Sequence, residues 1–242
     1  MPKRTFRSVL SALGLGASRK AGVPDEARNR ALSERFRQYH LGCGDILAAG
    51  FLNVDGEPQG VHWNLEPGVA HAVAGLADTY LLKHDLRHGI PAATGTLEAL
   101  YHSHFLEHLN DREGRAFLAE CHRCLQPGGV MRLAVPDFRL WCMNYVNDDQ
   151  AFFDWYRETY LGDDHARYMT KAAVFMGMVY NWGHKMAYDF ETLARLLDGL
   201  GFADVRAMAW GVSDRLADLT VLEGDSPRRF ESLVVECTKP PA

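Results

Sequence analysis

The segment His40-Leu41-Gly42-Cys43-Gly44-Asp45, followed by Gly50-Phe51-Leu52-Asn53-Val54-Asp55, decides the fold of this 242-residue chain. A short apolar strand runs into Gly-x-Gly, and because glycine has no Cβ the backbone there can approach a ligand closely. A second strand ends on Asp55, whose carboxylate can accept hydrogen bonds from both hydroxyls of a ribose. Glycines followed by an acid on the next strand predict a nucleoside-binding site.

A nicotinamide dinucleotide site, as in an oxidoreductase, needs two features that this stretch lacks. Its fingerprint has a third glycine, where this chain has Leu47. The acid of that fingerprint lies about 20 residues beyond the glycines, because a phosphate-binding helix separates the two strands. Asp55 follows Gly44 too closely to leave room for such a helix. The spacing therefore favours a nucleoside without a pyrophosphate.

The rest of the chain alternates short apolar segments with helical patterns, which indicates an open, mostly parallel α/β sheet. Helices are expected over 24–38, 111–125 and 190–200, where capping residues and glycine or proline stops mark the ends. Seven strands are expected over 39–41, 51–55, 79–83, 97–102, 130–135, 205–210 and 232–237.

Residues 138–182 interrupt this alternation and hold 12 of the 26 aromatic residues. They predict two or three helices inserted after a strand. Ligands of open α/β sheets bind beyond the carboxyl ends of the strands, so the insertion is expected to form a lid over the substrate. The alternative is that its aromatic side chains only fill the insertion's own core.

Further segments make the chain resemble the class I S-adenosylmethionine-dependent methyltransferases, in particular the short type-11-like predicted methyltransferases often found near polysaccharide genes. The resemblance covers residues 39–190, and the last strands extend it to about residue 239. It implies a Rossmann-like seven-stranded sheet and S-adenosyl-L-methionine as the cofactor. The segments are Leu41-Gly42-Cys43-Gly44, Asn53-Val54-Asp55, His84-Asp85-Leu86, Ser103-His104-Phe105-Leu106-Glu107-His108-Leu109, Leu125-Gln126-Pro127-Gly128-Gly129, Val135-Pro136-Asp137 and Gly183-His184-Lys185.

The resemblance also implies the contacts of that cofactor. Gly42 and Gly44 line its methionine part, Asp55 holds the ribose hydroxyls, and Asp85 receives the adenine amino group with Leu86 beside the ring. The missing helix between Gly44 and Asp55 departs from the family pattern and leaves the place of Asp55 open. The expected cofactor-binding residues are Leu41, Gly42, Cys43, Gly44, Asp55, Asp85, Leu86 and Ser103.

The expected reaction is methyl transfer to an oxygen of a small molecule or a sugar, the sugar resting on family analogy. A hydroxyl acceptor needs a base. His184 ends the insertion and is the first candidate, with His104 the second. A structural loop role for His184 is the alternative, as is a non-catalytic binding or interaction protein of the same fold.

His104-Phe105-Leu106-Glu107-His108 also matches H-x-x-E-H, a zinc-peptidase pattern. It follows a strand directly, so His104 is not expected to lie on the same helix as His108. The sequence shows no clear third ligand, and we therefore expect no metal and a structural role for His108.

Charge and cysteine content indicate the partners and the cellular location to expect. Residues 1–39 carry a net charge of +6 and the remainder −11, so the body offers no cationic surface for nucleic acid. Five scattered cysteines indicate reduced thiols and a cytoplasmic location, with Cys121 and Cys124 packed on a helix. Residues 1–23 form a basic arm before the domain of residues 24–242. The arm is expected to be mobile; peripheral membrane contact through residues 1–20 and a targeting peptide are the alternatives.

Overall fold

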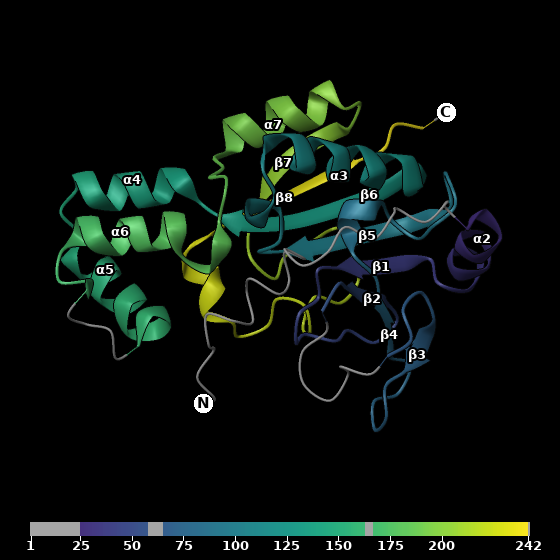
Figure 1. Cartoon of the computed structure of the whole chain (residues 1–242). Helices are drawn as coiled ribbons and strands as arrows, with labels where there is room; N and C mark the ends of the chain where they lie inside the picture. The colour runs from purple at the N-terminus through teal and green to yellow at the C-terminus, as the bar shows by residue number, and fades with distance from the viewer. Residues whose placement is uncertain (1–24, 58–64, 163–166, 242) are drawn as a thin grey trace.

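A computed structural model describes residues 25–57, 65–162 and 167–241, which are built around one eight-stranded sheet (Figure 1). The strand order is β3-β4-β2-β1-β5-β6-β8-β7. The five strands from β4 to β6 in this order are parallel, whereas β3 and β8 run antiparallel to their neighbours. The strands are β1 (Gln38–Leu41), β2 (Leu52–Asp55), β3 (Ala70–Ala72), β4 (Tyr80–Lys83), β5 (Leu97–Ser103), β6 (Leu125–Pro136), β7 (Ala203–Met208) and β8 (Ser232–Thr238).

The predicted mostly parallel α/β sheet is confirmed, and all seven expected strands are present. The eighth strand, β3, pairs antiparallel with β4 at the sheet edge. It has only three residues, which is too short for an apolar alternation to stand out in the sequence.

Helices cover one face of the sheet, as α3 and α7 do above the strands in Figure 1. Successive side chains of a strand point to opposite faces, so Met131, Leu133 and Val135 of β6 join the main core on the helix side. A capping box between Asn110 and Glu113 starts α3 where the sequence predicted it. The helices around the sheet are α2 (Glu26–Arg35), α3 (Asp111–Cys124) and α7 (Phe190–Gly199), with short turns η2 (Leu86–His88), η3 (Leu106–His108) and η7 (Pro227–Phe230).

On the opposite face, residues 209–226 pack against the sheet as an irregular segment of turns and bends. Arg132 of β6 points to this side and its side chain is fully buried. Its guanidinium forms ion pairs with Glu223 at 2.6 Å and Glu236 at 2.8 Å. It also donates hydrogen bonds to the carbonyls of Ala209 and Val212. The ion pair and hydrogen bonds of the buried Arg132 thus hold this segment against the middle of the sheet.

The connection between β1 and β2, residues 42–51, contains no helix, although all its residues are described. The buried side chain of Asn53 holds it instead: its amide bonds the backbone N–H and C=O of Ala48 and the carbonyl of Tyr80. The short spacing from Gly44 to Asp55 therefore ends β2 beside the glycine turn without a crossover helix.

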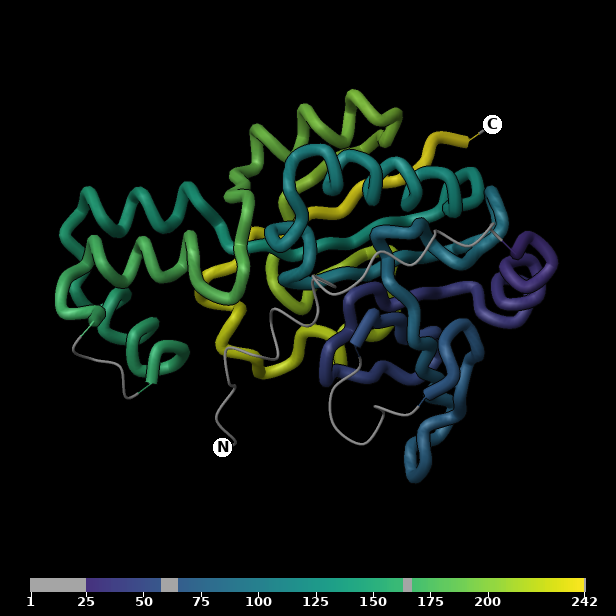
Figure 2. The backbone as a smooth tube through the Cα atoms, viewed as in Figure 1, coloured from purple at the N-terminus to yellow at the C-terminus, as the bar shows by residue number. Residues whose placement is uncertain are grey.

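The insertion forms three helices, α4 (Phe138–Val146), α5 (Gln150–Tyr156) and α6 (Lys171–Tyr180), with short turns at Arg157–Leu161 and Asn181–Gly183. Figures 1 and 2 show them grouped beyond the end of β6, apart from the sheet. Trp141 is fully buried at their centre and contacts the rings of Phe152, Tyr156 and Phe175. Many of the aromatic side chains therefore do fill the insertion's own core.

No helix within the described ranges is long and apolar enough to cross a membrane. The predicted basic arm, residues 1–23, lies outside the described residues. Cys121 and Cys124 are fully buried in α3, as the sequence predicted.

Candidate functional site

The glycine turn follows β1 at the carboxyl edge of the parallel strands. Gly42 and Gly44 have φ angles of +65° and +57°, which side chains other than glycine rarely adopt. The two positions differ in their surroundings. A Cβ on Gly42 would lie 2.7 Å from Phe105 Cγ, whereas a Cβ on Gly44 would have no atom of a described residue within 4 Å apart from its chain neighbours. The turn is therefore closed on one side by Phe105 and open at Gly44.

Asp55 lies directly against this turn. Its Oδ2 accepts a hydrogen bond from the backbone N–H of Gly44 at 2.9 Å, and its Oδ1 accepts one from Glu57 at 2.8 Å. Burial raises the pKa of Asp55, and these two N–H donors act in the opposite direction. The carboxylate is only partly exposed, so its free lone pairs can accept further hydrogen bonds from a ligand seated at Gly44.

Asp85 follows β4 at the same edge, but its carboxylate is already occupied. Arg87 donates from its backbone, from Nε at 2.9 Å and from Nη2 at 2.6 Å. Partial burial raises the pKa of Asp85, but the hydrogen bonds from Arg87 outweigh it and lower the pKa overall. Asp85 can receive an adenine amino group only in addition to Arg87 or in its place.

The other four predicted cofactor residues are buried. Leu41 and Leu86 belong to the main core, and Cys43 packs against Val73 and Leu81. Burial raises the pKa of the Cys43 thiol well above its usual range, so it is not a nucleophile. Ser103 ends β5 and is 8% exposed. From these positions Leu41 and Cys43 offer a ligand their backbone rather than their side chains.

The second group of polar residues begins where β5 ends. His104 has a φ of +50°, and its Nε2 lies 2.7 Å from the hydroxyl of Ser232. Its Nδ1 lies 3.4 Å from Oε1 of Glu107, a side chain that is 1% exposed. Burial lowers the pKa of His104 to about 4. For Glu107 burial acts to raise the pKa, but the neighbouring histidines lower it to about 2.

His184 reaches the same place from the end of the insertion. The backbone N–H of Lys185 donates to the carbonyl of Glu107 at 2.8 Å, which ties this segment to the loop after β5. The His184 ring lies edge-on to His108, with centroids 4.7 Å apart. Its Nδ1 lies 2.7 Å from the carbonyl oxygen of Met178 and must donate to it, so Nε2 keeps its lone pair.

The structure thus brings both predicted histidines into one cluster with Glu107 and His108, which we call the histidine cluster. His104 and His184 are 80 positions apart, and no local spacing links them. The sequence singled out H-x-x-E-H but did not assign Glu107 a role. The signal that could have done so is an acid flanked by two histidines directly after a strand.

The glycine turn and the histidine cluster adjoin at the loop after β5. Phe105 packs on Gly42, while His104, its neighbour in the chain, belongs to the cluster. A ligand at Gly44 and a second molecule at the cluster would therefore be separated by little more than this loop. The arrangement suits a group transfer between two bound molecules.

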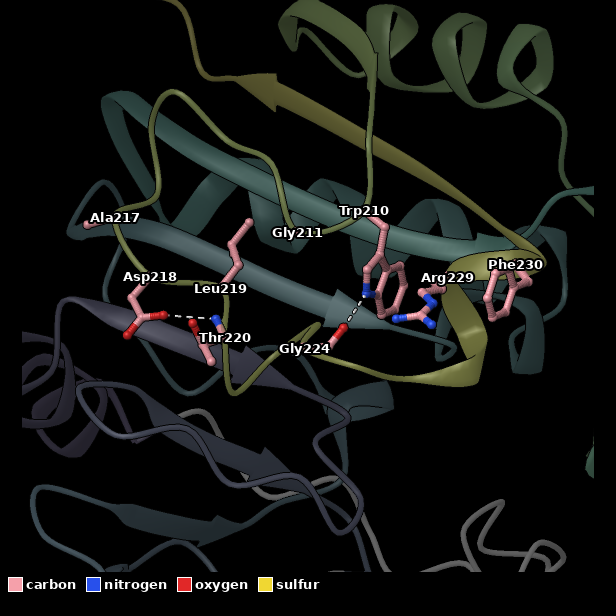
Figure 3. Close-up of a pocket in the computed structure, with 9 residues that line it drawn as sticks. All are labelled: Trp210, Gly211, Ala217, Asp218, Leu219, Thr220, Gly224, Arg229 and Phe230. Atoms are coloured by element: carbon pink, nitrogen blue, oxygen red, sulfur yellow. Dashed lines mark hydrogen bonds between the residues drawn. The ribbon is translucent and has the colours of Figure 1, made fainter.

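A cavity of about 650 Å³ lies on the face of the sheet covered by residues 209–226 (Figure 3). Trp210, Arg229 and Phe230 line one end, and Asp218 and Thr220 line the other. The Trp210 indole N–H donates to the carbonyl of Glu223, so the ring is held in place. Phe230 contacts Trp155 of the insertion, and two residues later the chain reaches Ser232, the hydrogen-bond partner of His104.

Comparisons with known proteins give one family match and several similar solved structures. The family described as "Methyltransferase domain" matches residues 39–133. Among solved structures, an S-adenosylmethionine-dependent methyltransferase from Archaeoglobus fulgidus is 15% identical, with 88% of this chain and 92% of that chain covered and a TM-score of 0.46. A possible histamine N-methyltransferase from Thermotoga maritima is 15% identical, with 97% and 89% covered and a TM-score of 0.43. A possible exported protein from Bordetella parapertussis is 17% identical, with 88% and 66% covered and a TM-score of 0.47. No curated protein matches the chain.

Proposed function

We propose that this chain, a class I S-adenosylmethionine-dependent methyltransferase, transfers a methyl group to an oxygen of a small hydroxylated molecule or sugar bound beside the histidine cluster. The observation that carries the proposal is the contact of Phe105 with Gly42. It brings the loop that bears His104 directly against the turn that we propose to hold the cofactor.

The residues at the glycine turn fit this cofactor. Gly44 faces open space, and the partly exposed Asp55 has lone pairs left for ribose hydroxyls. The absence of a helix over residues 42–51 removes the helix N-terminus that would attract a pyrophosphate. We propose that the backbone from Leu41 to Gly44 lies along the methionine part. Asp85 and Leu86 mark the adenine end, and Ser103, at the end of β5, lies on the other side of the glycine turn from them.

S-adenosylmethionine supplies, when bound, a methyl group activated by its sulfonium. The protein must position the acceptor, exclude water and accept the proton of the acceptor hydroxyl. We propose that His184 acts on the acceptor hydroxyl through Nε2, since Met178 fixes the ring and leaves that nitrogen available. Both nitrogens of His104 are engaged, by Ser232 and Glu107, which suits a positioning role for this residue.

The acceptor class is inferred from a neighbouring cavity, which contains no residue of the cluster but whose lining residue Phe230 precedes Ser232, the partner of His104, by two positions. The cavity of Figure 3 offers the rings of Trp210 and Phe230 together with the polar groups of Asp218, Thr220 and Arg229. Aromatic faces with a few placed polar groups suit a hydroxylated ring. The three-helix insertion stands at the far side of Phe230, where it can close over an acceptor as a lid.

We also propose a cytoplasmic location with peripheral membrane contact through residues 1–20. All five cysteines are free and four of them are buried, which supports the reducing cytoplasm. Residues 1–20 carry five basic and no acidic residues, and anionic membrane lipids would attract them.

The test is methyl transfer from isotopically labelled S-adenosylmethionine to a panel of sugars and hydroxylated small molecules, read by mass spectrometry. Replacing a general base typically costs about 10²- to 10⁴-fold in rate, so His184→Ala should lose activity on that scale. His122→Ala is the matched control, because His122 lies on α3 outside the cluster, where its ring bonds the carbonyl of Gly201 and contacts Phe202. Equal rates in both variants would contradict the role of His184.

A further inference from the structure

The histidine cluster contains a feature that methyl transfer does not explain. Glu107 is 1% exposed, and its carboxylate accepts no well-formed hydrogen bond from the described residues; the contact from His104 Nδ1 is long, at 3.4 Å. A buried carboxylate with one weak donor is costly, and proteins usually compensate for it with a cation or a close ion pair. The fold therefore leaves a strong acceptor buried at the edge of the candidate active site.

Two imidazoles lie within reach of this carboxylate. One ligand atom each from Glu107, His108 and His184 can be chosen so that all three lie within 4.8 Å of one another. Ligand atoms about 2.0–2.2 Å from a tetrahedral zinc ion lie about 3.3–3.6 Å apart. The three side chains therefore need to move toward one another by up to about 1 Å to share an ion.

We propose that Glu107, His108 and His184 bind one divalent first-row transition-metal ion, of which Zn²⁺ is the reference. Two imidazoles with one carboxylate are typical ligands for such ions, whereas Mg²⁺ and Ca²⁺ prefer oxygen ligands alone. Three protein ligands leave a coordination position open, as in catalytic zinc sites.

The surrounding hydrogen bonds match those of known metal centres. Histidine ligands commonly donate their second ring N–H to a carbonyl or carboxylate, which fixes the ring for coordination. His184 does this to Met178, so Nε2 is the ligand atom. His104, held by Ser232, stands 3.4 Å from Glu107 and orients the carboxylate from the other side.

The site also revises the expectation from the sequence. H-x-x-E-H lacked a clear third ligand, and the fold supplies it as His184, 76 positions after His108. Because His104 has a φ of +50° and precedes η3, it is Glu107 and His108 that provide the local pair. An ion held there would occupy Nε2 of His184, and the general-base role proposed above for that nitrogen would then apply only to the metal-free protein.

The binding test uses the full-length protein stripped of metal with a chelator. Calorimetry with Zn²⁺ and the visible spectrum of added Co²⁺ report binding without any methyl transfer, so the result does not depend on the proposed function. We expect one ion per chain, no binding of Mg²⁺ and no thiolate-to-cobalt band. Glu107→Gln keeps the shape of the side chain and should weaken Zn²⁺ binding by more than about 100-fold, beyond the usual effect of a residue outside the ligand set.

His122→Ala is again the matched control, because it removes a surface histidine and should leave Zn²⁺ affinity unchanged. Circular dichroism checks the fold of each variant. If Glu107→Gln does not fold, His108→Asn and His184→Asn replace it in the same comparison. Failure of the wild type to bind either ion, or equal binding by the ligand variants and His122→Ala, would overturn the proposal.

Discussion

Replacing each glycine of the turn with alanine separates the two sides of the candidate cofactor site. Gly42 and Gly44 have nearly the same backbone conformation, with φ of +65° and +57°. A Cβ on Gly42 meets the ring of Phe105, whereas a Cβ on Gly44 enters open space. The same chemical change should therefore damage folding at one position and ligand binding at the other.

The structure sets the size of each effect. A left-handed conformation costs a residue with a Cβ about 1–2 kcal/mol, and this cost applies to both variants. Overpacking against Phe105 adds about 1–3 kcal/mol for Gly42→Ala alone, giving a loss of about 2–5 kcal/mol in the free energy of unfolding. In a chain of this size each kcal/mol lowers Tm by about 2–4 °C.

Urea denaturation measures the first effect and calorimetry with S-adenosylmethionine the second. Gly44→Ala should lose little more stability than its backbone strain requires, yet weaken cofactor binding at least about tenfold, or 1.4 kcal/mol. In a Phe105→Ala background, the extra destabilisation of Gly42→Ala should disappear, because the clashing ring is gone. Equal stability losses for the two glycine variants, with unchanged cofactor binding in Gly44→Ala, would refute the reasoning.

Three further predictions concern single side chains. Asp55→Ala removes a charged acceptor and should weaken S-adenosylmethionine binding by about 1.5–3 kcal/mol in calorimetry; unchanged affinity in a folded variant would remove Asp55 from the site. Burial raises the pKa of Glu231 from 4.5 to about 8, so the folded protein holds a proton there and loses stability as pH rises between these values. The free energy of unfolding of the wild type and of Glu231→Gln is measured from pH 4.5 to 8.5 in the presence of a chelator. Over this range the wild type should lose up to about 5 kcal/mol more than the variant. Parallel pH profiles of the two proteins would contradict this. Arg132→Met leaves Glu223 and Glu236 buried without their cation and should cost about 3–5 kcal/mol in urea denaturation. An exposed arginine on α3 provides the control, and Arg115→Met should cost no more than about 1 kcal/mol.

The sheet could be predicted from the sequence because its rules are local. Short apolar runs give buried parallel strands, and caps such as Asn110 and Asp189 mark the helix starts. The segment that covers the sheet face opposite α3 and α7 could not be predicted from such local rules. Residues 209–226 have no periodic pattern, and they are held by Arg132, whose partners in this segment lie 77 to 91 positions away along the chain.

In the candidate site, too, the local features could be predicted and the contacts between distant segments could not. The glycine turn and Asp55 could be found from their spacing, because β1 and β2 are adjacent both in the chain and in the sheet. The occupation of Asp85 by Arg87 depends on a side-chain rotamer, which spacing does not reveal. The meeting of Glu107 with His184 depends on how the insertion returns to the sheet. A search for local motifs therefore finds His104, Glu107 and His108 but does not connect them with His184.

Calorimetry of the full-length protein with S-adenosylmethionine, S-adenosylhomocysteine and NAD tests the central claim most directly. The open position at Gly44, the acceptor Asp55 and the helix-free connection over residues 42–51 favour an adenosyl ligand without a pyrophosphate. We expect both adenosyl ligands to bind at one site and to compete with each other, and NAD to give no heat of binding. Binding of NAD without binding of either adenosyl ligand would contradict the account.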